Sequence, residues 1–215
     1  TAVRGVLDWY EKHIDSTKNM LGPMKWWGFV DWNHAFPNGT PDGATDGNSS
    51  VITLQYAYTL QQAAALFAHY GKEEEARHYQ RLATTLNQAA YELCFDRSRN
   101  EMANTPTRNT FSQHAGIIAV LAGAIPADKE KAVLQRVLED NTLSQATFYY
   151  RFYLNQALKK AGMADMYYEQ LQPWRDMLKI GLTTFAENPE PTRSDCHAWS
   201  ASPNYDFLDN IQSIM

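Results

Sequence analysis

Residues 50–94 decide the fold class, and they read SVITLQYAYTLQQAAALFAHYGKEEEARHYQRLATTLNQAAYELC. Ser49 or Ser50 is a suitable N-cap, and apolar residues then recur at helical spacing until Gly71 ends the helix. A second helix is predicted to follow at once and to run to Cys94, because its first turn carries glutamates that the helix dipole favours. The short glycine turn between them predicts an antiparallel helical hairpin.

The remaining chain repeats this pattern of paired helices. Apolar residues at helical spacing predict further helices over residues 1–14, 111–122, from 126 onward, 148–161, 163–180 and after 203. Pro173 interrupts the pattern of 163–180 and is expected to kink or split that helix. No segment shows sustained alternation with a period of two, so the sequence predicts an all-α protein.

Longer connections separate these helices at 16–49, 95–109, 141–147 and 181–203. Helix pairs joined alternately by short turns and long loops are typical of helical solenoids and of α/α toroids. We expect all the long loops at one rim, which favours a toroid with a site at its mouth, although the periodicity of the helices does not separate the two architectures.

Charge and composition exclude several classes of function. Lys and Arg total 19 against 24 Asp and Glu, and this net charge of −5 argues against a nucleic-acid-binding surface. No apolar run approaches the roughly 20 residues that span a bilayer. Cys94 and Cys196 are interpreted as buried free cysteines. Residues 42–48 lack the spacing of a calcium loop, and the sequence predicts no metal and no cofactor.

The connection Gly181–Pro203 concentrates polar and aromatic residues between prolines that prevent regular structure. The candidates on it are Glu187, Glu190, Asp195, His197 and Trp199. Carboxylates, an imidazole and an indole on one loop indicate a site for a polar, ring-shaped ligand, since loops often carry function. The alternative interpretation is a solvated loop with ordinary surface carboxylates.

Three segments carry a resemblance to a known family: GLTTFAE at 181–187, SDCHAW at 194–199 and FVDW at 29–32. They resemble motifs of the α-L-rhamnosidases of glycoside hydrolase family 78. The resemblance covers nearly the whole chain. It implies an (α/α)6 toroid that hydrolyses terminal α-L-rhamnose with inversion, acting on rhamnose-containing oligosaccharides or glycosides.

Carried over to matching positions, the resemblance implies Glu187 as the general base and His197 as a contact to the sugar. Trp32 matches an aromatic wall of the sugar subsite, and Trp199 is its neighbour. The alternatives are that Glu187 binds only a loop backbone N–H, that His197 is structural, and that the tryptophans belong to the core.

Other residues near these motifs have plainer interpretations. Asp31 either accepts a sugar hydroxyl or caps a turn. Trp26 and Trp27 are interpreted as packing residues, and His114, on an apolar helix face, as a core histidine.

The sequence also departs from the family. The family's acidic motif, which carries its general acid, does not occur in residues 1–215, and neither does its downstream β-sandwich. We therefore expect one all-α domain over 1–215, an incomplete toroid with little activity alone. A non-catalytic carbohydrate-binding or scaffold relative, and a toroid glycosidase for another sugar, are the alternatives.

An incomplete toroid would expose an apolar face, which predicts association into a homo-oligomer. The chain starts at Thr1 rather than at Met, so its first residues indicate no compartment. A preceding signal peptide would direct the protein to the periplasm or outside the cell, and otherwise it would be cytoplasmic.

Overall fold

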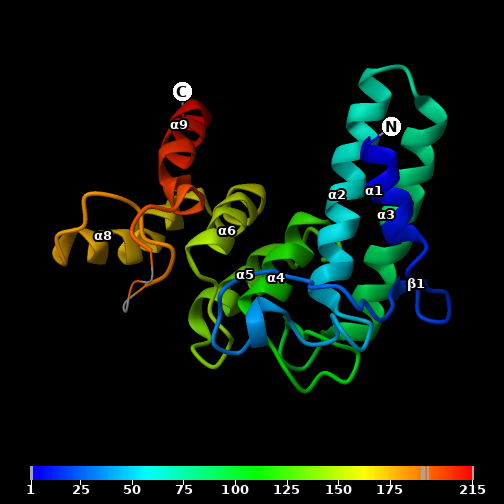
Figure 1. The fold of residues 1–215 in the computed structure, drawn as a ribbon, viewed down its shortest axis with the longest axis horizontal. Coiled ribbons are helices and arrows are strands. Elements are labelled where there is room, and N and C mark those ends of the chain that lie inside the picture. The colour runs from blue at the N-terminus through cyan, green and yellow to red at the C-terminus, as the bar shows by residue number, and fades with distance from the viewer. Residues whose placement is uncertain (1, 190–191, 193, 215) are drawn as a thin grey trace.

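The structure, a computed structural model, describes residues 2–189, 192 and 194–214. Helices dominate the described residues and confirm the all-α class (Figure 1). The α-helices are α1 (Ala2–Glu11), α2 (Ser50–His69), α3 (Glu73–Cys94), α4 (Gln113–Leu121), α5 (Glu130–Glu139), α6 (Phe148–Lys160), α7 (Tyr167–Gln170), α8 (Gln172–Lys179) and α9 (Ser202–Ile214). Short 3-10 turns lie at η1 (Pro37–Gly39), η2 (Ala164–Met166) and η3 (Ala198–Ala201).

The helical hairpin of α2 and α3 forms as predicted, and its two helices pack along each other. Gly71 between them adopts a φ of 67°, a left-handed conformation that costs glycine little. Ser49 occupies the N-cap position of α2, but its hydroxyl accepts no bond from the first turn. The predicted capping site is therefore confirmed, whereas the capping bond is absent.

Four helices form a continuous row, in which α2 contacts α4, α4 contacts α6, and α6 contacts α9. Helices α3 and α5 pack against α2 and α4, their hairpin partners. Each helix of the row follows one of the long connections, and these connections are joined at that end. Ser50 N–H donates to Asn104 O at 2.8 Å, and Gln113 N–H donates to Ser144 O at 3.0 Å. The loops before α2, α4 and α6 thus share one rim, as the sequence analysis expected.

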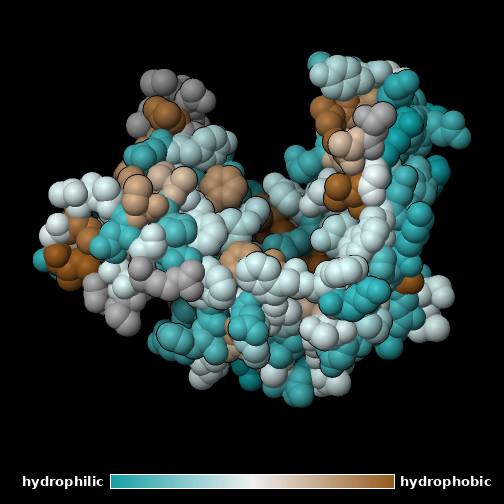
Figure 2. Space-filling view, viewed as in Figure 1, coloured by the Kyte–Doolittle hydropathy of each residue, from teal (hydrophilic) through white to brown (hydrophobic). Residues whose placement is uncertain are grey.

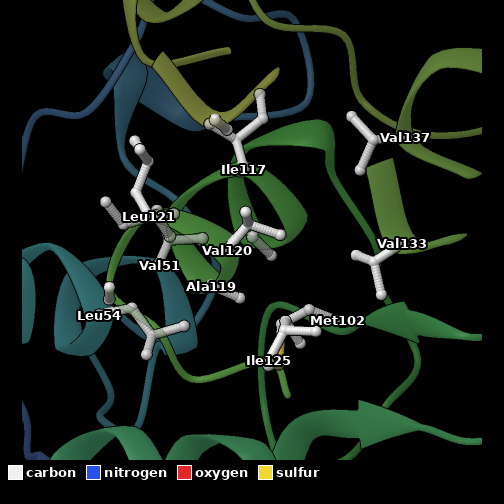
Figure 3. Close-up of a cluster of buried hydrophobic side chains, with 14 of the residues drawn as sticks. Val51, Leu54, Met102, Ile117, Ala119, Val120, Leu121, Ile125, Val133 and Val137 are labelled. Carbon is white, nitrogen blue, oxygen red and sulfur yellow. The ribbon is translucent and has the colours of Figure 1, made fainter. Parts of the chain in front are cut away.

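Helix α4 lies at the centre of the core, and every one of its residues is buried. Figure 3 shows its apolar side chains meeting those of α2 and α5, including Val51, Leu54 and Val137. Gly116 allows α5 to approach closely, because a Cβ there would lie 2.5 Å from Val137 Cγ2. The backbone of α4 therefore fixes the positions of its neighbours.

Small strands occur where the sequence analysis expected none. Ile14, assigned by its spacing to the first helix, lies instead in β1 (Ile14–Asp15), which pairs with β2 (Met20–Leu21). The segment 95–109, expected to be a polar loop, contains the antiparallel pair β3 (Phe95–Asp96) and β4 (Glu101–Met102). Asn19 and Asn100 adopt positive φ and close the two tight turns.

Pro173 splits the predicted helix 163–180, as expected. The segment forms η2, α7 and α8. The proline occupies the first turn of α8, where a backbone N–H has no intrahelical acceptor, so its missing N–H costs no hydrogen bond.

In the space-filling view a hollow opens between the α2–α3 hairpin on the right and the C-terminal part on the left (Figure 2). Among the described residues, no helix has the length and apolar character required to cross a membrane.

Candidate functional site

The loop between α8 and α9 folds back on itself through backbone hydrogen bonds. Glu187 N–H donates to Ser194 O, and His197 N–H donates to Phe185 O, both at 2.7 Å. These two bonds bring residues that are ten positions apart in the sequence to the same place. In the described part of this loop, two backbone hydrogen bonds therefore fix Glu187 and His197.

The base of this loop is anchored in an apolar cluster. Ala186 is fully buried in a cluster that also contains Phe148 and Trp174. Ser200 bonds in both directions there, since its hydroxyl donates to Ala186 O at 2.6 Å and its carbonyl accepts from Trp174 Nε1 at 2.7 Å. A small residue at 186 suits this closed position, and the backbone on either side of it fixes where Glu187 begins.

Glu187 and His197 form a carboxylate–imidazole pair. Glu187 Oε1 lies 3.8 Å from His197 Nε2. The Glu187 residue is 2% exposed, whereas the His197 side chain is 30% exposed. The other ring nitrogen, Nδ1, lies 2.9 Å from Ser194 Oγ, so the imidazole is held by a hydrogen bond on that side and faces Glu187 with Nε2. The pair offers a nearly buried carboxylate behind a partly accessible imidazole.

Trp199 is the centre of an aromatic cluster beside this pair. Its ring centroid lies 4.8 Å from that of His197, 5.4 Å from Tyr149 and 6.3 Å from Phe29, to which it is nearly parallel. The buried Nε1 of Trp199 has no hydrogen-bond partner in the described part of the chain. A buried indole N–H normally has an acceptor, so this atom is an unsatisfied donor enclosed within the cluster.

Trp32 joins the same cluster from the connection before α2. Its ring lies 5.1 Å from Phe29 and 6.2 Å from Trp27, so Phe29 links it to Trp199. Trp27 is 67% exposed and its Nε1 donates to Asn38 O at 2.9 Å. Trp26 is 62% exposed, so the expectation that both tryptophans are packing residues is wrong.

The structure brings Trp32, Trp199, Glu187 and His197 into one region and adds two residues that the sequence analysis missed. Phe29 contacts both predicted tryptophans, Trp32 and Trp199, and Tyr149 contacts Trp199 from the first turn of α6. The signal for Phe29 was its place in the FVDW motif, of which only the last two residues were interpreted. Tyr149 carried no local signal, because its role depends on where α6 begins relative to two distant loops.

Asp31 lies in the interior, with 0% exposure. Its Oδ2 accepts from His114 Nε2 at 2.7 Å and from Thr147 N–H at 2.8 Å, and its Oδ1 accepts from the Thr147 hydroxyl. The prediction that Asp31 accepts a sugar hydroxyl does not fit this burial. Asp31 instead connects the loop that carries Trp32 to α4 and to the start of α6. The expectation that His114 is a core histidine is confirmed.

Two tyrosines of α6 that pack near these groups remain neutral phenols. Burial raises the pKa of Tyr150 well above its ordinary value, and its ring lies 4.5 Å from that of His114. Burial, followed by the neighbouring Tyr149, raises the pKa of Tyr153 to about 12. At neutral pH both hydroxyls therefore keep their protons and can donate hydrogen bonds.

The other described residues singled out in this loop are exposed. Asp195 is exposed, and its carbonyl accepts from the Thr184 hydroxyl. Cys196 is an exposed free cysteine, so the expectation that it is buried is wrong, whereas Cys94 is buried as expected. Glu190 lies outside the described residues. Within the part of the chain that the structure describes, no group of three or more His, Cys, Asp or Glu could hold a metal ion.

The chain matches the model of a known family over nearly its whole length. The model of the bacterial α-L-rhamnosidase six-hairpin glycosidase domain matches residues 1–211. The chain belongs to this family. The match confirms the resemblance drawn from the 181–199 segment and the six-hairpin architecture of the fold.

Solved structures of rhamnosidases are similar to this rhamnosidase-family chain. A family 78 rhamnosidase of Bacillus sp. GL1 aligns with a TM-score of 0.84 at 25% identity, over 97% of this chain and 23% of that one. A Klebsiella oxytoca rhamnosidase with rhamnose bound aligns with a TM-score of 0.79 at 22% identity, over 94% of this chain and 40% of that one. This chain therefore spans less than half of either enzyme. No curated protein matches it.

Proposed function

We propose that this chain carries the general base and the sugar-contacting surface of a glycoside hydrolase that removes terminal α-L-rhamnose with inversion. The observation that carries the proposal is the placement of Glu187 at 3.8 Å from His197, beside the ring of Trp199. Family membership supports glycoside hydrolysis. The similar Klebsiella oxytoca enzyme, solved with rhamnose bound, supports the choice of sugar.

Inverting hydrolysis requires two carboxyl groups, roughly 6.5–9.5 Å apart, on opposite sides of the anomeric carbon. We assign Glu187 as the ionised group. It takes a proton from the attacking water while the oxygen of that water bonds to the anomeric carbon. The second group donates a proton to the leaving oxygen as the glycosidic bond breaks. The family's general-acid motif does not occur in residues 1–215, so we assign the proton donor to sequence outside them.

The remaining residues are assigned to binding. His197 is placed to donate to a sugar hydroxyl, because its imidazole is partly exposed and held at Nδ1 by Ser194. Trp32 and Trp199 offer apolar faces to the ring and the methyl group of a deoxysugar. Asp31 is reassigned as a positioning residue, since it reaches only protein groups.

The proposal is tested by measuring hydrolysis of 4-nitrophenyl α-L-rhamnoside by the complete protein and following the anomeric product by NMR. Inversion predicts β-L-rhamnose as the first product. Glu187→Gln is expected to lower kcat by about 10²–10⁴-fold, the usual contribution of a general base, with an unchanged circular dichroism spectrum.

Asp195→Asn is the matched control, because it removes an exposed carboxylate from the same loop and should leave kcat unchanged. Full turnover by Glu187→Gln would refute the base assignment. An α-anomer as first product would refute inversion, and a folded complete protein that hydrolyses no rhamnoside would refute the function.

A further inference from the structure

A groove leads away from the candidate site between α6, α8 and the loop after Glu187. It consists of two adjoining cavities of about 830 and 510 Å³. Both cavities are lined by Gln145, Arg151, Pro173, Asn188 and Pro189, so the same side chains face both of them. Their combined size suits more than one sugar-sized unit.

Arg151 is the charged residue at the junction of the two cavities. It lies in the first turn of α6 and is partly buried. Its Nη1 donates to Gln170 O at 3.5 Å, and no described carboxylate forms an ion pair with it. Burial lowers the pKa of Arg151, while the charge of Asp31 acts in the opposite direction.

The position of this guanidinium is unfavourable without a ligand. Buried cations are normally paired with an anion, and a cation in the first turn of a helix opposes the helix dipole. Asp31 forms no ion pair with Arg151, although its charge acts on it, and its two oxygens accept bonds from His114 and Thr147 instead. A partly buried arginine beside open space is therefore suited to bind an anion from outside.

The charges around the groove favour a negative group at Arg151. None of the described residues that line the larger cavity is acidic. The smaller cavity is lined by two acids, Glu169 and Asp176, and both are exposed. Asp176 already accepts bonds from Gln172 and Lys179, which lower its pKa. An anion at Arg151 would thus avoid like charges on the side facing Trp32.

The groove shares one residue, Trp32, with the candidate site. Trp32 lines the larger cavity and also belongs to the aromatic cluster that contains Trp199. Asn188, on the groove wall, directly follows Glu187 in the sequence. A ligand unit in the groove would therefore lie next to a sugar held at Glu187 and Trp199.

We propose that this groove binds a carboxylate-bearing unit linked to the sugar that is hydrolysed, with Arg151 as its charge partner. The proposal rests on the proposed function and adds a class of substrate to it. Guanidinium groups recognise carboxylates through paired, charge-assisted hydrogen bonds, and the amides of Gln145 and Asn188 can bond to neighbouring hydroxyls. A uronic acid and an aromatic acid both supply this carboxylate.

The test compares kcat/KM of the complete protein on matched acids and methyl esters. One pair is a rhamnosyl uronate disaccharide and its ester, and the other is 4-carboxyphenyl α-L-rhamnoside and its ester. We expect about tenfold or greater preference for at least one acid, as for a hydrogen-bonded charge. The pair that shows the preference identifies the source of the carboxylate.

Arg151→Gln should remove this preference and leave the ester rates unchanged, and Arg151→Lys should keep part of it. Arg175→Gln is the control, because Arg175 bonds to Tyr168 O outside the groove. Equal loss on acids and esters in Arg151→Gln, or no preference in the wild type, would overturn the proposal.

Two further measurements keep the proposal separate from the proposed function and from folding. If no rhamnoside is hydrolysed, the proposed function fails. Calorimetric titration with the uronate disaccharide and its ester then still tests whether the groove prefers the acid, and equal affinities would overturn the groove assignment. If Arg151→Gln does not fold, the salt dependence of the wild type replaces it. The ratio of kcat/KM on the acid to kcat/KM on the ester should fall as salt rises, and a constant ratio would overturn the proposal.

Discussion

Two carboxylate–histidine pairs of the described residues, one beneath the Trp32 loop and one in the loop before α9, differ in burial and in spacing. In the first, Asp31 and His114 are 2.7 Å apart and both side chains are fully buried. In the second, Glu187 and His197 are 3.8 Å apart, and the His197 side chain is 30% exposed. We call the fully buried pair, Asp31 and His114, the closed pair, and the partly exposed pair, Glu187 and His197, the open pair.

The difference follows from what surrounds each pair. Asp31 also accepts two bonds from Thr147, so its carboxylate is satisfied entirely by protein, and breaking the contact would leave a buried charge unpaired. His197 is held only at one ring nitrogen by a short contact, and its face packs against Trp199. A closed pair stabilises the fold, whereas an open pair retains the capacity to bind a ligand.

The largest effect that would test this difference is expected for Asp31→Ala. Removing one member of a buried pair typically costs about 3–5 kcal/mol, so the free energy of unfolding should fall by that amount. Urea unfolding followed by circular dichroism measures it. Activity should fall as well, because Asp31 fixes the loop that carries Trp32.

A double-mutant cycle sharpens the same point. Asp31→Ala and His114→Ala should be strongly non-additive in unfolding free energy, since the second change removes a partner already lost. The corresponding cycle for Glu187→Gln and His197→Gln should be close to additive. Equal coupling in the two cycles would contradict the distinction between a closed and an open pair.

A smaller effect, on function alone, is expected for His197→Gln. Losing one hydrogen bond to a neutral hydroxyl typically costs about 0.5–1.5 kcal/mol, so kcat/KM on 4-nitrophenyl α-L-rhamnoside should fall up to roughly tenfold. The thermal midpoint should not change, because the side chain is partly exposed. A large loss of stability with unchanged kinetics would make His197 a structural residue.

The smallest effect concerns the reactivity of two thiols, one in the core and one next to His197, and it is measured on the unaltered protein. Burial raises the pKa of Cys94 to about 12, whereas Cys196, which precedes His197, is exposed. In the native protein one thiol should react promptly with 5,5′-dithiobis(2-nitrobenzoate), and the second only after unfolding. Cys196→Ser should abolish the prompt reaction; two promptly reacting thiols would show that the core around Cys94 opens readily.

Local sequence signals predicted much of the fold. The helix pairs, the turn at Gly71 and the break at Pro173 each depend on residues a few positions apart, so they could be inferred directly. Two-residue strands such as β3 and β4 escaped prediction, because so short a segment shows no alternation. Family motifs also identified the loop that holds Glu187 and His197.

Roles that depend on distant partners could not be inferred. Asp31 meets His114 and Thr147 across 83 and 116 positions of sequence, and nothing local distinguishes it from a ligand-binding aspartate. For the same reason the exposure of Trp26 and Trp27 and that of Cys196 were predicted wrongly. Burial is a property of the packed chain, whereas composition describes only the residue itself.

The sequence by itself therefore determined the helices, their pairing and the family, because helical period, caps and motifs act over short distances. Only the tertiary structure decided which carboxylate is closed and which is open, and which arginine faces a groove without an acidic partner among the described residues. Those outcomes depend on desolvation, and desolvation is set by which remote segments pack around a charge.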